Sequence, residues 1–123
     1  MLAIFYIFVG GGVGCVVRYL ISILLKNQVS SFPLSTLIAN VIACVVFAIT
    51  LVAIKNLQGL SDQLRFFVLT GFCGGLSTFS TFSYETMVLL KSGSYTTAGL
   101  SILLNLLCCF ACFIWMHKHV NYA

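Results

Sequence analysis

The chain has 123 residues, of which 61% are hydrophobic and 7% are charged. A soluble domain carries about 25% charged residues, so this composition excludes a soluble domain and indicates a membrane protein. The net charge is +4, but the basic residues stand singly at the ends of apolar segments, as at a lipid headgroup layer, and they predict no nucleic-acid interface.

The first apolar segment, residues 2–25, is long enough to cross a hydrocarbon core of about 30 Å and is interpreted as a retained helix. Gly10 and Gly14 form a small-residue pair that allows another helix to pack closely. Arg18 lies about 24 Å along this helix, near its far end, where the side chain can reach water. Two roles stay open for Arg18, a simple interfacial anchor and a functional group.

The second span, residues 33–54, begins at the only proline of the chain. Thr36 and Asn40 are four residues apart and therefore share one helix face. Asn40 lies roughly 10 Å into the bilayer, counted by helical rise from Pro33. Taken alone, Asn40 favours a hydrogen bond between helices that holds the fold together.

The third span, residues 64–90, contains the most unusual stretch of the chain, residues 71–83, with three glycines and five hydroxyls. A bilayer tolerates such polarity only inside protein or along an aqueous path. The pair Gly74 and Gly75 predicts a broken helix, as in transporters and channels that bind ions. A plain glycine-rich packing helix would explain the glycines but not the hydroxyls around Phe79 and Phe82, which share one face. Glu85 is expected near the opposite interface, where it need not be buried.

The fourth span, residues 96–116, carries a weak polar stripe of Ser101, Asn105 and Cys109 at a spacing of four. All six cysteines lie in apolar runs, so they are interpreted as small buried hydrophobes. A metal site at Cys108, Cys109 and Cys112 is the less favoured alternative, because zinc sites usually close with four ligands.

Four spans in one domain, residues 1–123, place both termini on one side of the membrane. The loops then carry equal numbers of basic residues, with Lys55, Arg65 and Lys118 on one side and Arg18, Lys26 and Lys91 on the other. This balance gives no preferred orientation, so the chain is expected to insert both ways and to pair as an antiparallel dimer.

Three segments together resemble the CrcB/Fluc family of fluoride channels, and the match covers nearly the whole chain. They are residues 11–19 (Gly-Gly-Val-Gly-Cys-Val-Val-Arg-Tyr), residues 35–40 (Ser-Thr-Leu-Ile-Ala-Asn) and the stretch at residues 71–83. The resemblance implies an all-α membrane protein of the cell membrane. Four transmembrane helices per subunit, the third of them broken, would assemble as an antiparallel, dual-topology homodimer that exports fluoride passively and relieves its toxicity.

The resemblance also implies the roles of individual residues. Phe79 and Phe82 match the family's phenylalanine box, Asn40 its pore asparagine, and Arg18 a basic residue near the aqueous vestibule. Backbone carbonyls near Gly74 and Ser77, from both subunits, would hold one central structural Na⁺. Further pore residues expected on these helices are Thr36, Ser80, Thr81, Ser83 and Asn105. The fourth span departs from the family, because Asn105 and Cys109 stand where small hydroxyl residues are expected.

No general base, nucleophile or nucleotide loop is found, so an enzyme is not expected. A small proton-coupled multidrug exporter is an alternative, but it needs a carboxylate deep in the membrane. The two acids, Asp62 in a loop and Glu85 near a span end, argue against it. A non-transporting scaffold subunit would leave the polar third span unexplained.

Overall fold

The computed structural model describes residues 1–26, 31–57 and 60–120, and within these ranges the chain is helical and has no strand. The first, second and fourth spans are the continuous helices α1 (Leu2–Leu24), α2 (Leu34–Leu57) and α6 (Tyr95–His119). The third span is divided into α3 (Asp62–Arg65), the π-helical segment η1 (Phe66–Phe72), α4 (Cys73–Leu76) and α5 (Phe79–Lys91). All four spans are long and apolar enough to cross a membrane, which confirms the predicted all-α class.

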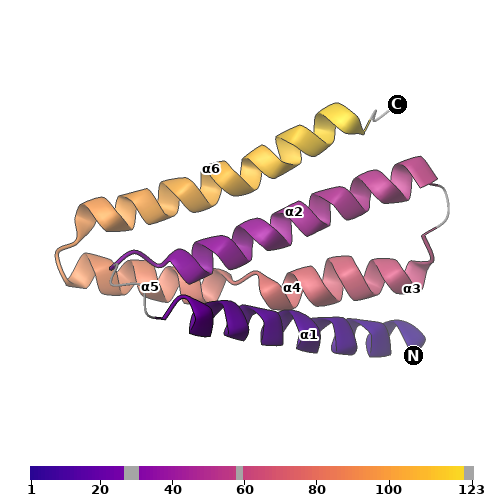
Figure 1. Cartoon of the computed structure of the whole chain (residues 1–123), viewed down its shortest axis with the longest axis horizontal. Helices are drawn as coiled ribbons and strands as arrows, with labels where there is room; N and C mark the ends of the chain where they lie inside the picture. Colours follow the sequence, from indigo (N-terminus) through magenta and orange to yellow (C-terminus); the bar gives the residue numbers. More distant parts are fainter. Residues whose placement is uncertain (27–30, 58–59, 121–123) are drawn as a thin grey trace.

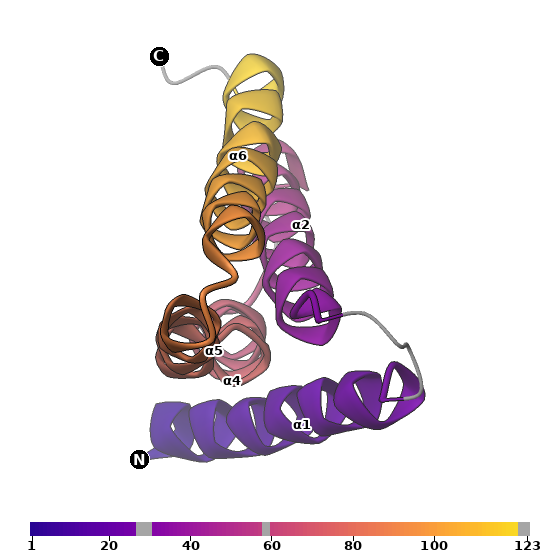
Figure 2. The same cartoon turned by 90° about the vertical axis from the view of Figure 1, so that its left-hand side faces the viewer.

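The spans are arranged in layers along one long axis. Helix α6 lies beside α2, and α1 lies on the far side of the third span, against η1 and α4 (Figures 1 and 2). The first residues of α1 and the last residues of α6 lie at the same end of the long axis (Figure 1). An even number of spans brings the first and the last helix back to the same end of the molecule, as the sequence predicted.

The contact between α1 and the third span is made by glycines. A Cβ atom at Gly14 would collide with the carbonyl oxygen of Phe72 and lie 2.8 Å from the amide nitrogen of Leu76. One at Gly75 would collide with the carbonyl oxygen of Gly11. Because these neighbours are backbone atoms, they cannot rotate away as a side chain can. The expected close helix packing at Gly14 is therefore confirmed.

The third span is broken, but not at the glycine pair. Gly74 and Gly75 lie within α4, and the chain becomes extended only at Ser77 (φ −72°, ψ 152°) and Thr78 (φ −150°, ψ 118°). The expected break near Gly74 to Ser77 is therefore found at the end of that range, and the glycine pair itself stays helical. Gly75 allows α1 to approach, whereas the break follows two residues later, where a hydroxyl residue can cap the next helix.

The buried core of the described residues is narrow. One cluster joins Ala39 and Ala43 of α2 to Cys73 and Leu76 of α4. Large apolar side chains on the outer faces of the helices are exposed, among them Phe8, Tyr19, Leu107 and Phe110. A water-soluble monomer rarely exposes so much apolar surface, whereas a membrane protein places it against lipid or another subunit. An antiparallel dimer stays a prediction about a second chain.

Candidate functional site

The break in the third span is held by Asn40 of α2. The amide of Thr78 donates a hydrogen bond to Oδ1 of Asn40 at 2.8 Å, and Oγ1 of Thr78 accepts one from the amide of Thr81 at 3.2 Å. Extended backbone at Ser77 and Thr78 removes the intrahelical acceptor that the Thr78 amide would otherwise have. A polar group from another helix must replace it in a membrane, and Asn40 does so.

A chain of amides connects this break to α6. Nδ2 of Asn40 donates to Oδ1 of Asn105 at 2.9 Å, and Nδ2 of Asn105 donates to the carbonyl of Ser101 at 2.9 Å. The donor and acceptor roles in this row of hydrogen bonds are fixed by its two end groups. The Thr78 amide can only donate, and the Ser101 carbonyl can only accept. Each side-chain amide has two N–H groups, so each keeps one hydrogen beyond those used here.

These amides form one wall of a cavity of about 250 Å³ beside the break. The rings of Phe79 and Phe82 form another part of the wall, with centroids 5.9 Å apart and planes inclined by 46°. Phe79 is 80% exposed, so the cavity is open on the side of α5. The complete lining consists of Asn40, Cys44, Ser77, Thr78, Phe79, Phe82, Asn105, Leu106 and Cys109.

A second, polar cavity of about 270 Å³ lies on the other side of Thr78, which lines both. It brings together Arg18 of α1, Thr36 of α2 and Thr81 of α5, three residues singled out in the sequence. Nη2 of Arg18 lies 3.9 Å from Sγ of Cys15, a weak contact that leaves the positive charge free to face the cavity. The remaining lining residues are Tyr19, Ser22, Ser35 and Glu85.

Glu85 is more enclosed than expected. Its side chain is half-buried, and Oε2 is buried with no hydrogen-bond partner among the described residues. Glu85 lies six residues after Phe79 on α5 and lines the polar cavity. The expectation that this carboxylate need not be buried is therefore wrong for one of its oxygens.

Two of the expected pore residues lie outside both cavities of the single chain. Oγ of Ser83 donates to the carbonyl of Phe79 at 2.8 Å, and Oγ of Ser80 lies 3.5 Å from Oγ1 of Thr78. Both serines are exposed on α5. Each serine directly follows a phenylalanine, Ser80 after Phe79 and Ser83 after Phe82. Consecutive residues of a helix point in different directions, so the serines do not share the face of the rings.

The expected metal position, at Gly74 and Ser77, offers oxygen atoms of the backbone. The carbonyl of Cys73 already accepts from both the amide and Oγ of Ser77, at 2.9 and 2.8 Å. The carbonyls that follow it in α4 have no intrahelical amide to accept from, because residues 77 and 78 are extended. Gly74 is exposed, and a Cβ there would meet no atom within 4 Å. Carbonyl oxygens at an exposed helix end are the donor type that hard cations prefer.

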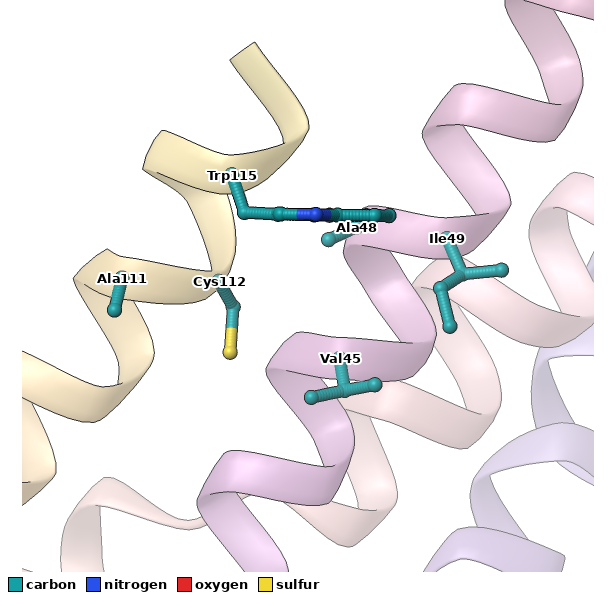
Figure 3. Close-up of a pocket in the computed structure, with 6 residues that line it drawn as sticks. All are labelled: Val45, Ala48, Ile49, Ala111, Cys112 and Trp115. Atoms are coloured by element: carbon teal, nitrogen blue, oxygen red, sulfur yellow. The ribbon is translucent and has the colours of Figure 1, made fainter. Parts of the chain in front are cut away.

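A hollow of about 400 Å³ elsewhere on the molecule is a different kind of surface. It lies between α2 and α6 and is lined by Val45, Ala48, Ile49, Ala111, Cys112 and Trp115. Trp115 extends from α6 toward Ala48 on α2 (Figure 3). Its walls carry no hydroxyl or amide side chain, so it cannot replace the water around an ion as the cavity beside the break can.

Thr78 is the residue that the sequence interpretation overlooked. It lies in the stretch at residues 71–83, where the sequence did not distinguish it from the other hydroxyl residues. In the structure it caps α5, bonds to Asn40 and lines both cavities. A signal was present, since threonine is favoured at the residue before a helix. Cys44 was also missed as a lining residue, although it lies four residues after Asn40 on the same face.

The chain is similar to a known group of proteins. The family model described as CrcB-like protein, Camphor Resistance (CrcB) matches residues 5–116. A Pyrococcus furiosus protein named "Fluoride-specific ion channel FluC" is 46% identical over 101 residues, which cover 82% of this chain and 81% of the relative. A protein of that name from Escherichia coli is 39% identical over 105 residues, covering 85% and 83%. "Fluoride-specific ion channel FluC 1" of Yersinia pseudotuberculosis is 39% identical over 99 residues, covering 80% and 78%.

Proposed function

The chain belongs to the CrcB family, and on that premise we propose that it is a fluoride-selective channel through which fluoride leaves the cell passively, which relieves its toxicity. It is a multi-pass protein of the cell membrane. It is not an enzyme, since its relatives are ion channels.

The observation that carries this proposal is the meeting of two phenylalanine rings and two amides in one cavity beside the break. Fluoride is small and strongly hydrated, so losing its water is costly unless other donors replace it. The second N–H groups of Asn40 and Asn105 are such donors, and they carry no fixed charge that would trap the ion. The positive edges of Phe79 and Phe82 add weak attraction for an anion.

In this proposal the polar cavity is the vestibule that delivers fluoride to the break. Arg18 raises the local concentration of anions there, and Thr36 and Thr81 donate hydroxyl hydrogens to the ion. Thr78 connects the two cavities. Ser80 and Ser83 are exposed on α5 and line neither cavity of the single chain. They would line the ion path only if a second subunit covered this surface.

That second subunit is an antiparallel copy of the same chain. The cavity is open where Phe79 is exposed, and Gly74 presents bare backbone on the surface. An antiparallel partner would close both, and the balanced loop charges permit both orientations. Adding two lysines between residues 26 and 32 should favour one orientation and lower activity, and co-expression with an oppositely biased variant should restore it. Full activity of the biased variant alone would contradict dual topology.

A Na⁺ ion at the centre of this dimer would be held by carbonyls near Gly74 and Ser77 of both subunits. Such an ion would supply a fixed positive potential that favours anions nearby, and in a low dielectric this potential is little screened. Gly74 leaves its backbone exposed, and Ser77 ends α4. Carbonyl oxygens at these positions in two subunits could coordinate one ion on a two-fold axis.

One observation favours a second candidate, a proton-coupled exporter. Oε2 of Glu85 is buried with no hydrogen-bond partner among the described residues, and the side chain lines the polar cavity, where a carboxylate could carry a proton. A coupled exporter would move its substrate against a gradient when a proton gradient is applied, whereas a channel only dissipates gradients.

The decisive experiment uses liposomes that contain only this protein and are loaded with fluoride or chloride. We expect rapid fluoride efflux that a fluoride electrode detects, little chloride efflux, and no uphill movement when a pH gradient is imposed. Equal fluoride and chloride rates, or transport driven by the pH gradient, would contradict the proposed function.

A further inference from the structure

Two thiols from different helices meet in the wall of the cavity beside the break. Cys44 belongs to α2 and Cys109 to α6, and each lies four residues, about one turn, after a member of the hydrogen-bonded pair Asn40 and Asn105. Both are half-buried, and both line the cavity that also contains Phe82 and Asn105. The pair is therefore reached from the cavity and is not sealed between helices.

The other cysteines do not complete a larger cluster. Sγ of Cys112 donates to the carbonyl of Cys108 at 3.2 Å, and Cys112 faces the apolar hollow instead (Figure 3). Cys73 lines a neighbouring cavity of about 250 Å³, which Cys44 also lines, but Cys73 does not line the cavity beside the break. Cys15 lines the polar cavity. Among the described residues, no three histidine, cysteine or acidic side chains are placed to hold one metal ion together.

We propose that Cys44 and Cys109 form a two-coordinate thiolate site for a soft metal ion of the Hg²⁺ type, and that the bound metal blocks the channel. The site comes from the positions of these two residues in one cavity wall, and of the three cysteines considered on α6 it uses Cys109 alone.

The chemistry balances without an oxidant. One Hg²⁺ ion reacts with two thiols, two S–H bonds break, two Hg–S bonds form, and two protons leave through the cavity to water. The product has no net charge, so it avoids the large cost of placing a charge in a low-dielectric interior.

The number and type of ligands select the metal. Thiolates favour soft ions, whereas Mg²⁺ and other hard cations prefer oxygen. Zinc binds thiolates too, but its structural sites use four ligands, and this site offers two.

Binding by the thiol pair does not depend on the proposed function, but blockage does. The metal would lie in the wall of the cavity that also holds both phenylalanine rings, where it would obstruct the proposed ion path. A titration of metal binding tests the first statement, and fluoride efflux tests the second.

The test uses full-length protein with Hg²⁺ alone as the probe. A variant in which Cys15, Cys73, Cys108 and Cys112 are replaced by alanine keeps only the pair, and it should bind one Hg²⁺ per chain. Removing either remaining thiol, by Cys44→Ala or Cys109→Ala, should weaken binding by about 100-fold or more, because the second Hg–S bond is intramolecular. In the natural chain, mass spectrometry should find Hg²⁺ protecting Cys44 and Cys109 together from alkylation.

Fluoride efflux from liposomes is measured before and after Hg²⁺, and each variant is compared with its own untreated rate. The natural chain and the Cys15→Ala control should lose at least tenfold in rate and recover with excess dithiothreitol, whereas Cys44→Ala and Cys109→Ala should be far less sensitive. Equal Hg²⁺ affinity with one thiol, or independent alkylation of the two, would overturn the site. A filled pair that leaves efflux unchanged would overturn the blockage. No efflux from the untreated natural chain would refute the proposed function and leave the metal titration valid.

Discussion

The contact between α1 and the third span leads to a sharp prediction about Gly14. In Gly14→Ala, the new methyl group would collide with the carbonyl oxygen of Phe72 and lie 2.8 Å from the amide nitrogen of Leu76. Carbon atoms pack at about 3.5–4.0 Å, so α1 must move away by roughly 1 Å. Gly12, on the same helix, is exposed, and a Cβ there meets no atom of the chain within 4 Å.

The comparison of Gly14→Ala with Gly12→Ala isolates the effect of the collision. Replacing glycine by alanine favours a helix by up to about 1 kcal/mol at either position, and this gain cancels in the comparison. Forcing an extra methyl group into a packed contact costs about 1–3 kcal/mol. Gly14→Ala should therefore be less stable than Gly12→Ala by about 1–3 kcal/mol.

Unfolding of both variants in the same detergent, followed by circular dichroism, gives this difference. Because Phe72 and Leu76 come just before the break, fluoride efflux of the folded Gly14→Ala protein should fall as well. Stabilities that agree within about 0.5 kcal/mol, the range of ordinary surface substitutions, would refute the argument from close packing.

Three further predictions concern the ion path. Phe79→Ile and Phe82→Ile should slow fluoride efflux greatly while the protein still assembles, because isoleucine keeps the bulk but loses the positive ring edge. Parent-like efflux rates would show that the rings serve only in packing. Asn40→Asp should reduce efflux by orders of magnitude at pH 7, since a carboxylate repels fluoride by about 4 kcal/mol at close range with a dielectric of about 20. The new carboxylate would also face Oδ1 of Asn105 without a hydrogen to donate, so gel filtration must first show that the variant assembles correctly. An assembled variant with parent-like efflux would show that Asn40 is not part of the ion path. Replacing external Na⁺ with a large organic cation should lower activity slowly if at all, because release of a buried ion needs local opening, and efflux that follows external Na⁺ within milliseconds would indicate coupled transport.

Much of the architecture was predictable because hydropathy and helical spacing are local properties. Four apolar stretches of membrane length predict four spans, and each stretch is helical in the structure. The hydroxyl-rich stretch at residues 71–83 predicted a broken third span, because polar backbone in a membrane needs a special environment. The same stretch, with two others, indicated the family that the comparisons support.

The positions of individual groups depend on which helix faces meet, and that is decided by tertiary packing. Asn40 was expected either to hold helices together or to line the path, and it bonds to Thr78 and Asn105 while also lining the cavity. The sequence predicted a break near Gly74 to Ser77, and the structure has it at Ser77 and Thr78, while Gly75 stays helical and packs against α1.

The sequence by itself determined the class of protein, the number of spans, the family and most of the residues around the break, because each depends on composition or on motifs within one segment. Only the tertiary structure decided that Cys44 and Cys109 line one cavity, that Glu85 buries one oxygen, and that Ser80 and Ser83 are exposed. The physical reason is that neighbours on different helices are set by which helix faces pack together, and spacing along one helix does not say which helix lies beside it.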